Sequence, residues 1–148
     1  SGMDTQAGPM LKQIKQLGLN VKFITGDGAC TGEVIKLAGD AITGNTFCTQ
    51  PGLPLDKMPG GKNFNERFKK RFNADVQIYA PYAYDATSAI IEAMKAANSS
   101  DPAKYAASIA KVNFPGVIGT VAFDAKGDIK DGAVTVYQFK AGKWETAN

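Results

Sequence analysis

The stretch that decides the fold is Val21-Lys-Phe-Ile-Thr-Gly-Asp-Gly28, in which an apolar segment ends in an aspartate between two glycines. Residues 21–25 predict a short buried strand, and the glycines predict a sharp turn after it. In open α/β sheets, ligands bind beyond the carboxyl ends of the strands. Asp27 is therefore a candidate ligand residue, because its carboxylate only accepts hydrogen bonds and suits a cation or an ammonium group. The alternative is a structural role for Asp27, in a turn or as a helix cap.

Helices and strands alternate around this stretch. Asp4 is expected to cap a first helix with an apolar stripe, and Gly18 is expected to end it. The strand at 21–25 follows at once, Thr31 caps a short helix, and residues 45–48 form the next expected strand. A helix followed directly by a strand is typical of a parallel α/β layer, so the sequence predicts the α/β class.

The middle of the chain differs in composition. Residues 49–61 hold three prolines and three glycines, which predicts a crossing or linker segment. Beyond it, Phe64, Phe68 and Phe72 recur every four residues among basic side chains. We interpret this helix as packing its aromatic stripe into a core and exposing a solvated basic face. A helix lying on a membrane surface is the alternative.

The last part of the chain changes from helical to strand periodicity. Residues 80–97 predict a long helix, and Asp101-Pro102 provides an N-cap and a first-turn signal for another. Apolar and polar residues then alternate in 117–123 and in 133–139. This pattern predicts a terminal antiparallel meander.

The composition limits the possible functions. The chain has 148 residues, of which 44% are hydrophobic and 21% charged, as in globular domains. Its net charge of +3 comes from scattered lysines and arginines, which does not suggest nucleic-acid binding. Histidine is missing, so triads and metal sites built on histidine are excluded. No nucleophile and base stand in a recognisable arrangement, and we expect no enzyme, no metal and no cofactor.

The two cysteines, Cys30 and Cys48, predict a disulfide. Cys30 follows one expected strand, and Cys48 ends the next one, which places them near each other. A reactive thiol or two separate buried thiols are the alternatives. A disulfide indicates an oxidising compartment.

Several stretches together resemble the C-terminal part of the type I periplasmic solute-binding proteins, the branched-chain amino acid binding family. The resemblance covers nearly the whole chain, in the family's order. It rests on Gly2-Met-Asp-Thr-Gln-Ala-Gly-Pro-Met-Leu11, Gln16-Leu-Gly-Leu19, Phe23-Ile-Thr-Gly-Asp-Gly28, Tyr79-Ala-Pro-Tyr-Ala-Tyr-Asp-Ala86 and Gly119-Thr-Val-Ala-Phe-Asp-Ala-Lys-Gly-Asp128. Similar proteins have two α/β lobes, joined by crossing strands, that close on a small ligand.

The resemblance assigns roles to three residues. Asp27 matches the acidic position that receives the α-ammonium group of an amino-acid ligand. Tyr79 matches an aromatic position that approaches the ligand from the facing lobe, with core packing as its alternative. Met3 matches a position that lines the pocket, where it would provide an adaptable apolar wall.

The resemblance also implies a division of the chain, which is truncated relative to the family. Residues 1–48 resemble the second lobe, 49–61 a crossing segment and 62–113 helices that flank the first lobe. Residues 114–148 resemble strands that return to the second lobe. The aromatic stripe would then lack its usual sheet. We expect the missing N-terminal portion or self-association to supply a partner.

These features predict the solute-binding component of an ABC-type importer for branched-chain or similar small amino acids. The protein would be periplasmic, would bind an amino acid or a related carboxylate, and would dock on a membrane permease. Two alternatives remain open. One is an interaction, regulatory or oligomerising module derived from this fold. The other is a binder of small aromatic or carboxylic acids.

Overall fold

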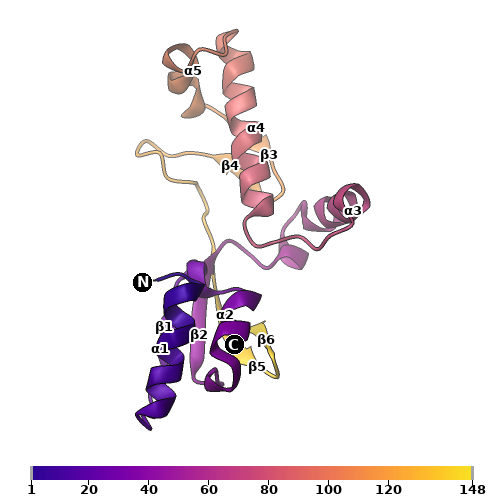
Figure 1. The fold of residues 1–148 in the computed structure, drawn as a ribbon. Coiled ribbons are helices and arrows are strands. Elements are labelled where there is room, and N and C mark those ends of the chain that lie inside the picture. The colour runs from indigo at the N-terminus through magenta and orange to yellow at the C-terminus, as the bar shows by residue number, and fades with distance from the viewer. Residues whose placement is uncertain (1, 148) are drawn as a thin grey trace. The chain divides into compact units, whose positions relative to one another are not determined.

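The computed structural model describes residues 2–147, which divide into two compact units. Unit 1 contains residues up to Gly52 together with those from Ala133 onward, and unit 2 contains Leu53–Gly132. The first and last parts of the chain therefore share a unit, as their indigo and yellow ribbons show (Figure 1). The sequence groups 114–148 together with 1–48, whereas in the structure residues 114–132 belong to unit 2.

Unit 1 is built on a mixed four-stranded sheet with the order β1-β2-β5-β6. Strands β1 and β2 are parallel, with Thr25 opposite Cys48, and the two other pairs are antiparallel. This arrangement confirms the predicted α/β class, with a parallel pair and terminal antiparallel strands. The strands are β1 (Phe23–Thr25), β2 (Thr46–Pro51), β5 (Val134–Lys140) and β6 (Lys143–Thr146).

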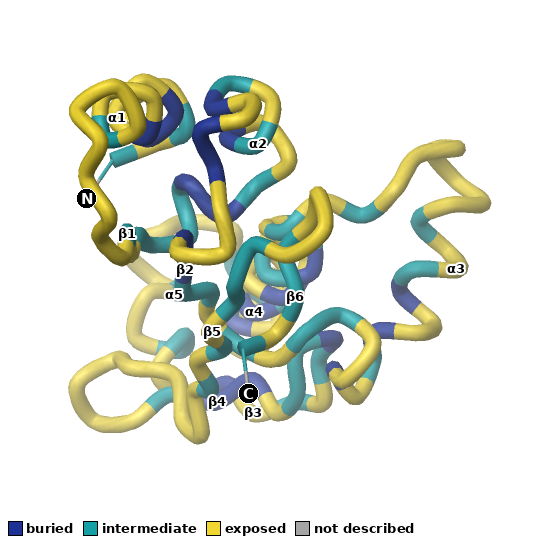
Figure 2. The backbone as a smooth tube through the Cα atoms, turned by 90° about the horizontal axis from the view of Figure 1, so that it is seen from below, coloured by how far each residue is buried: buried dark blue, intermediate teal, exposed yellow. Residues whose placement is uncertain are grey.

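The helices α1 (Asp4–Gln16) and α2 (Gly32–Ala38) form the core of unit 1 together with one face of the sheet. Gly8 lets the helices approach closely, because a Cβ at this position would lie 2.6 Å from the Cβ of Leu37. Figure 2 shows that the buried residues of the two helices face each other. The buried core consists of Ala7, Leu11, Ala29, Val34, Ala38, Ala41 and Ile42.

The opposite face of this sheet is exposed in the described part of the chain. Side chains alternate between the two faces along a strand. Phe23 thus packs against the helix core, whereas Ile24 beside it is 69% exposed. Val134 and Val136 in β5 are 70% and 42% exposed. Unit 1 therefore presents an apolar sheet surface to its surroundings.

An exposed ion pair connects α1 to the segment after α2, on the side of unit 1 away from the carboxyl end of β1. Lys15 in α1 contacts the Asp40 carboxylate at 2.6 Å. The hydrogen bond and the positive charge of Lys15 lower the pKa of Asp40 below its ordinary value. Both side chains are exposed, so this pair contributes little to stability.

Unit 2 contains three α-helices, the short 3₁₀ helix η3 (Leu55–Lys57) and a small hairpin. No helix among the described residues is both long enough and apolar enough to cross a membrane. The long helix matches its predicted bounds at 80–97. The elements are α3 (Gly61–Phe72), α4 (Ala80–Ala97), α5 (Pro102–Ile109), β3 (Asn113–Pro115) and β4 (Thr120–Ala122).

The predicted terminal meander is correct for its last hairpin, β5–β6, and wrong for the strand before it. Strand β4 pairs with β3, whereas β5 pairs with β2 and β6 in the other unit. The physical reason is a tight turn, in which Gly116 N–H donates to the carbonyl of Gly119 at 2.7 Å. Gly119 has a φ of 131°, which favours glycine, and the turn folds β4 back onto β3.

Two apolar clusters and one buried carboxylate hold unit 2 together. One cluster joins α4 to the hairpin through Ala89, Ala93, Val112 and Val121, and the other contains Met58, Phe64 and Val117. Asp85 in α4 is only 2% exposed and accepts hydrogen bonds from Val117 N and Ile118 N, both at 2.9 Å. A buried carboxylate is stable here because backbone donors satisfy it.

Candidate functional site

Asp27 lies immediately beyond the carboxyl end of β1, where the sequence places it. It begins the short 3₁₀ helix η1 (Asp27–Ala29) and is half-buried. The backbone closes the turn, because Cys30 N–H donates to the Asp27 carbonyl at 3.0 Å. The turn therefore fixes the Cα position of an acidic residue at the edge of the sheet where α/β proteins bind ligands.

Met3 lies beside this turn. It is 57% exposed and immediately precedes α1. A Cβ placed on Gly28 would lie 2.7 Å from the Met3 sulfur, so glycine at position 28 leaves room for the thioether. The structure thus brings Met3 next to the Gly26-Asp27-Gly28 turn. An apolar, adaptable side chain and a carboxylate share this corner of unit 1.

Asp4 has a different role from the predicted N-cap. It is the first residue of α1, which Met3 precedes as the N-cap residue. The Asp4 carboxylate instead accepts a hydrogen bond from the Thr31 hydroxyl at 2.8 Å. Thr31 is the N-cap of α2, as predicted, and accepts from Glu33 N at 3.0 Å. The starts of α1 and α2 are therefore joined beside the Asp27 turn.

The disulfide predicted between Cys30 and Cys48 is confirmed. Their Cα atoms are 5.5 Å apart, which lies within the usual range for a disulfide. Cys30 follows η1, and Cys48 lies in β2 opposite Thr25, so the bond ties the Asp27 turn to the neighbouring strand. Both cysteines are buried, and neither is a free thiol.

Two further side chains donate hydrogen bonds to backbone carbonyls of the segment that follows the Asp27 turn. Gln50 in β2 donates its amide N–H to the Cys30 carbonyl at 3.0 Å, and the Trp144 indole N–H in β6 donates to the Thr31 carbonyl at 2.9 Å. Sequence reasoning missed both residues. Neither stands near the turn in the sequence. The β1–β2 pairing brings Gln50 there, and the order β1-β2-β5-β6 brings Trp144.

Tyr79 belongs to unit 2, whereas Asp27 and Met3 belong to unit 1. Tyr79 directly precedes α4, and its carbonyl accepts from Ala83 N at 2.9 Å. The side chain is 44% exposed, so the structure does not bury it in a core.

The side chains of Asp27 and Met3 have the chemistry to bind a small ligand. Within residues 2–147, no group of three or more cysteines, aspartates and glutamates could hold a metal ion. A carboxylate on a braced turn can accept hydrogen bonds from a ligand ammonium group, and a thioether can cover an apolar ligand side chain.

The chain is similar to known proteins along almost its whole length. A family model described as periplasmic binding protein matches residues 2–143. The Leu/Ile/Val-binding protein homolog 1 of Brucella abortus (strain 2308) is 33% identical over 144 residues, or 95% of this chain and 38% of that protein. A leucine-, isoleucine-, valine-, threonine-, and alanine-binding protein of Pseudomonas aeruginosa is 31% identical over 93% of this chain and 36% of that protein.

The solved structures show the same relationship. The leucine binding protein LivK from Thermotoga maritima MSB8 has a TM-score of 0.84 and 28% identity over 99% of this chain and 42% of that one. The chain thus spans well under half the length of the relatives it matches. It has the α/β fold of type I periplasmic binding proteins in truncated form. The chain belongs to the periplasmic binding protein family.

Proposed function

We propose that the protein is the solute-binding component of an ABC-type importer and that it binds branched-chain or similar small amino acids. The observation that carries the proposal is the position of Asp27 on a disulfide-held turn beside Met3. A relative that is 33% identical to this chain over 144 aligned residues is named for binding leucine, isoleucine and valine.

In this proposal, each candidate residue recognises one part of the ligand. Asp27 accepts hydrogen bonds from the α-ammonium group, and Met3 covers the aliphatic side chain. Unit 1 corresponds to one lobe of the family's clamp and supplies both residues. Tyr79 keeps the role that the resemblance gives it, an aromatic contact to the ligand. The ligand is held without a chemical step, and binding favours the closed conformation by a shift in population.

The family and the disulfide support a cellular setting for this function. Disulfides persist in oxidising compartments, which supports an extracytoplasmic, periplasmic location. The closed, ligand-bound form would dock on the membrane permease of the importer. That docking would deliver the amino acid to the transport pathway.

The proposal is tested by comparing leucine with its deaminated analogue, 4-methyl-2-oxopentanoate. Both are titrated by calorimetry into the 148-residue chain and into the protein at its full natural length. We expect leucine to bind the full-length protein, and the oxo acid to bind at least about tenfold more weakly, because it cannot donate to Asp27. Equal binding of the two compounds would instead favour the alternative, a binder of carboxylic acids. Binding of neither would contradict the proposed function.

A further inference from the structure

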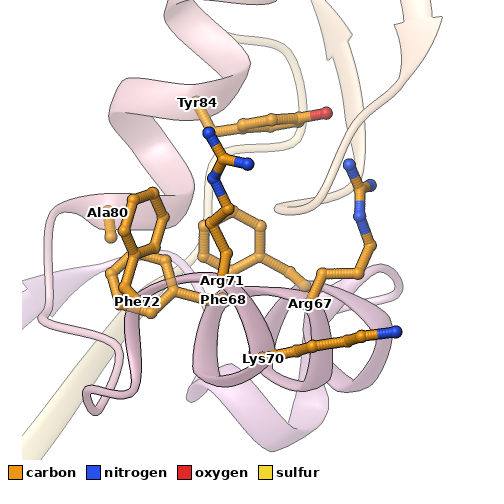
Figure 3. A pocket seen from close by; sticks show the side chains of 8 residues that line it. Arg67, Phe68, Lys70, Arg71, Phe72, Ala80 and Tyr84 are labelled. Atoms are coloured by element: carbon orange, nitrogen blue, oxygen red, sulfur yellow. The ribbon is translucent and has the colours of Figure 1, made fainter.

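Two places among the described residues leave space beside a side chain. The first is a groove between α3 and the start of α4, where Figure 3 shows Arg67 and Arg71 extending on the side where Tyr84 lies. The family resemblance places a sheet against these helices that this chain does not contain, so the exposed rings of the groove belong to a lobe core and are not a ligand surface. The second place is in unit 1, where the Met3 sulfur lies on Gly28.

The Met3 side chain occupies the space that a side chain at position 28 would need. A Cβ on Gly28 would lie 2.7 Å from the Met3 sulfur and 3.7 Å from its terminal methyl carbon. Nonbonded contacts between heavy atoms are best at about 3.5–4.0 Å, so an alanine at position 28 would displace the sulfur by roughly 1 Å. The carbonyl oxygen of Gly2, at 3.4 Å, is at an ordinary contact distance. The thioether is therefore the group that a side chain at position 28 would displace.

The backbone of Met3 is fixed on both sides of its Cα atom. Its N–H donates to the Gln6 side chain at 3.0 Å, and its carbonyl accepts from Gln6 N and Ala7 N, both at 3.0 Å. Ala7 is buried in the core of unit 1, and Asp4, the residue after Met3, accepts the hydrogen bond from Thr31. The start of α1 therefore stays in place when position 28 changes, and the flexible thioether moves.

The backbone of Gly28 is fixed as well. Gly28 lies inside η1, where Ala29 N–H donates to the Gly26 carbonyl at 3.3 Å. Cys30 N–H closes the turn on the Asp27 carbonyl, and the disulfide holds Cys30. Gly28 does not have a positive φ, so an alanine fits its backbone conformation. A substitution of Gly28 by alanine should thus leave the turn intact and act on the Met3 side chain.

We propose that Gly28 is a specificity-determining residue of the amino-acid site. Its missing side chain lets the Met3 thioether lie on the turn, which leaves space in front of the turn for a ligand side chain as long as that of leucine. This inference rests on the proposed function, in which Asp27 binds the ammonium group and Met3 covers the aliphatic side chain. Gly28 directly follows Asp27, so a thioether displaced from Gly28 enters the space of that side chain. A larger residue at position 28 restricts the site to shorter side chains.

The experiment compares the binding of leucine and valine by calorimetry, in the protein at its full natural length and in its Gly28→Ala variant. The side chain of leucine is one carbon longer than that of valine, so leucine needs the space that the displaced thioether would take. We expect Gly28→Ala to lower the ratio of leucine affinity to valine affinity by about tenfold or more, the usual effect of one methylene in an apolar pocket. The melting temperature should be nearly unchanged, because the backbone of the turn does not move.

The same substitution in a Met3→Ala background tests whether the thioether transmits the effect. Without the thioether, Gly28→Ala displaces nothing, and we expect it to change the leucine-to-valine ratio by less than about twofold, as for independent sites. Gly32→Ala is the matched control. Gly32 is exposed at the start of α2, and a Cβ there would have no heavy atom of the described chain within 4 Å. This control should bind both amino acids as the wild type does.

Three results would overturn the proposal. The first is an unchanged leucine-to-valine ratio in Gly28→Ala. The second is an equal fall of the ratio in the Met3→Ala background, which would show that the thioether does not transmit the effect. The third is equal weakening of both amino acids with a lower melting temperature, which would show that Gly28 serves only the turn.

The proposed function is judged by a separate measurement, the preference of the wild type for leucine over 4-methyl-2-oxopentanoate. Gly28→Ala should retain this preference, because Asp27 stays in place. Loss of the preference in the wild type would contradict the role of Asp27, whereas the three results above concern Gly28 alone.

Discussion

The indole N–H of Trp144 donates to the backbone carbonyl of Thr31 at 2.9 Å, although 113 positions separate the two residues. Thr31 is the N-cap of α2, and Asp27 lies four residues before it. The last strand of the chain therefore supports the segment that carries the candidate ligand residue.

Replacing Trp144 with phenylalanine removes this hydrogen bond and keeps most of the ring. The partly buried Thr31 carbonyl then loses its partner, so we expect the free energy of unfolding to fall by about 1–2 kcal/mol. Urea denaturation measures this change. Lys143→Gln, at the neighbouring exposed position, should leave the midpoint nearly unchanged. Equal midpoints for Trp144→Phe and the wild type would show that the hydrogen bond does not support the segment.

The Cys30–Cys48 disulfide should stabilise the fold by restricting the unfolded chain. The bonded residues are 18 positions apart, and a loop of this size corresponds to about 3 kcal/mol in the chain-entropy model. The variant with alanine at both positions should lose about this much in urea denaturation. In the wild type, thiol titration of the oxidised, unfolded protein should find no free thiol. Two titratable thiols there would contradict the disulfide.

Asp85 should be important for the stability of unit 2. Its substitution by alanine removes the acceptor for the Val117 and Ile118 N–H groups. The buried Val117 N–H then loses its hydrogen bond to the carboxylate. We expect a loss of about 3 kcal/mol or more. Glu92→Ala on the same helix is the control, because Glu92 forms only an exposed pair with Lys95 and should cost much less. Similar losses for the two variants would show that the hydrogen bonds accepted by Asp85 do not stabilise unit 2.

Local signals in the sequence explain what could be predicted. Thr31 and Asp101 cap the helices that follow them, and Pro81 stands in the first turn of α4. These signals act within a few residues, so the helices could be located from the sequence. The position of Asp27 after β1 was predictable for the same reason.

Long-range pairing explains what could not be predicted. Alternating residues show that β4 and β5 are strands, but they do not show which strand each one pairs with. Gln50 and Trp144 also have no local signal, since their contacts with the Asp27 segment depend on the order of strands in the sheet. The sequence therefore predicted the position of Asp27 but not the hydrogen bonds from Gln50 and Trp144 that support its segment.

The exposed apolar sheet face of unit 1 predicts that the 148-residue chain does not remain a free monomer. Ile24 and Val134 are about 70% exposed on a sheet face, and such a surface favours association. We expect light scattering at micromolar concentration to show self-association or a bound companion. Ile24→Thr should reduce the association. A compact, folded monomer of 15.6 kDa would contradict this prediction.

The central claim, that Asp27 receives the ammonium group of an amino acid, is tested most directly by Asp27→Asn in the full-length protein. The asparagine keeps the shape of the side chain, removes its charge and directs donors toward the ligand. Asp40→Asn is the matched control, because Asp40 is an exposed aspartate in the same unit, where it pairs with Lys15. Calorimetry with leucine should show a loss of affinity of about ten- to a hundredfold for Asp27→Asn, with a nearly unchanged melting temperature. Unchanged affinity together with a lower melting temperature would show that Asp27 serves only the turn.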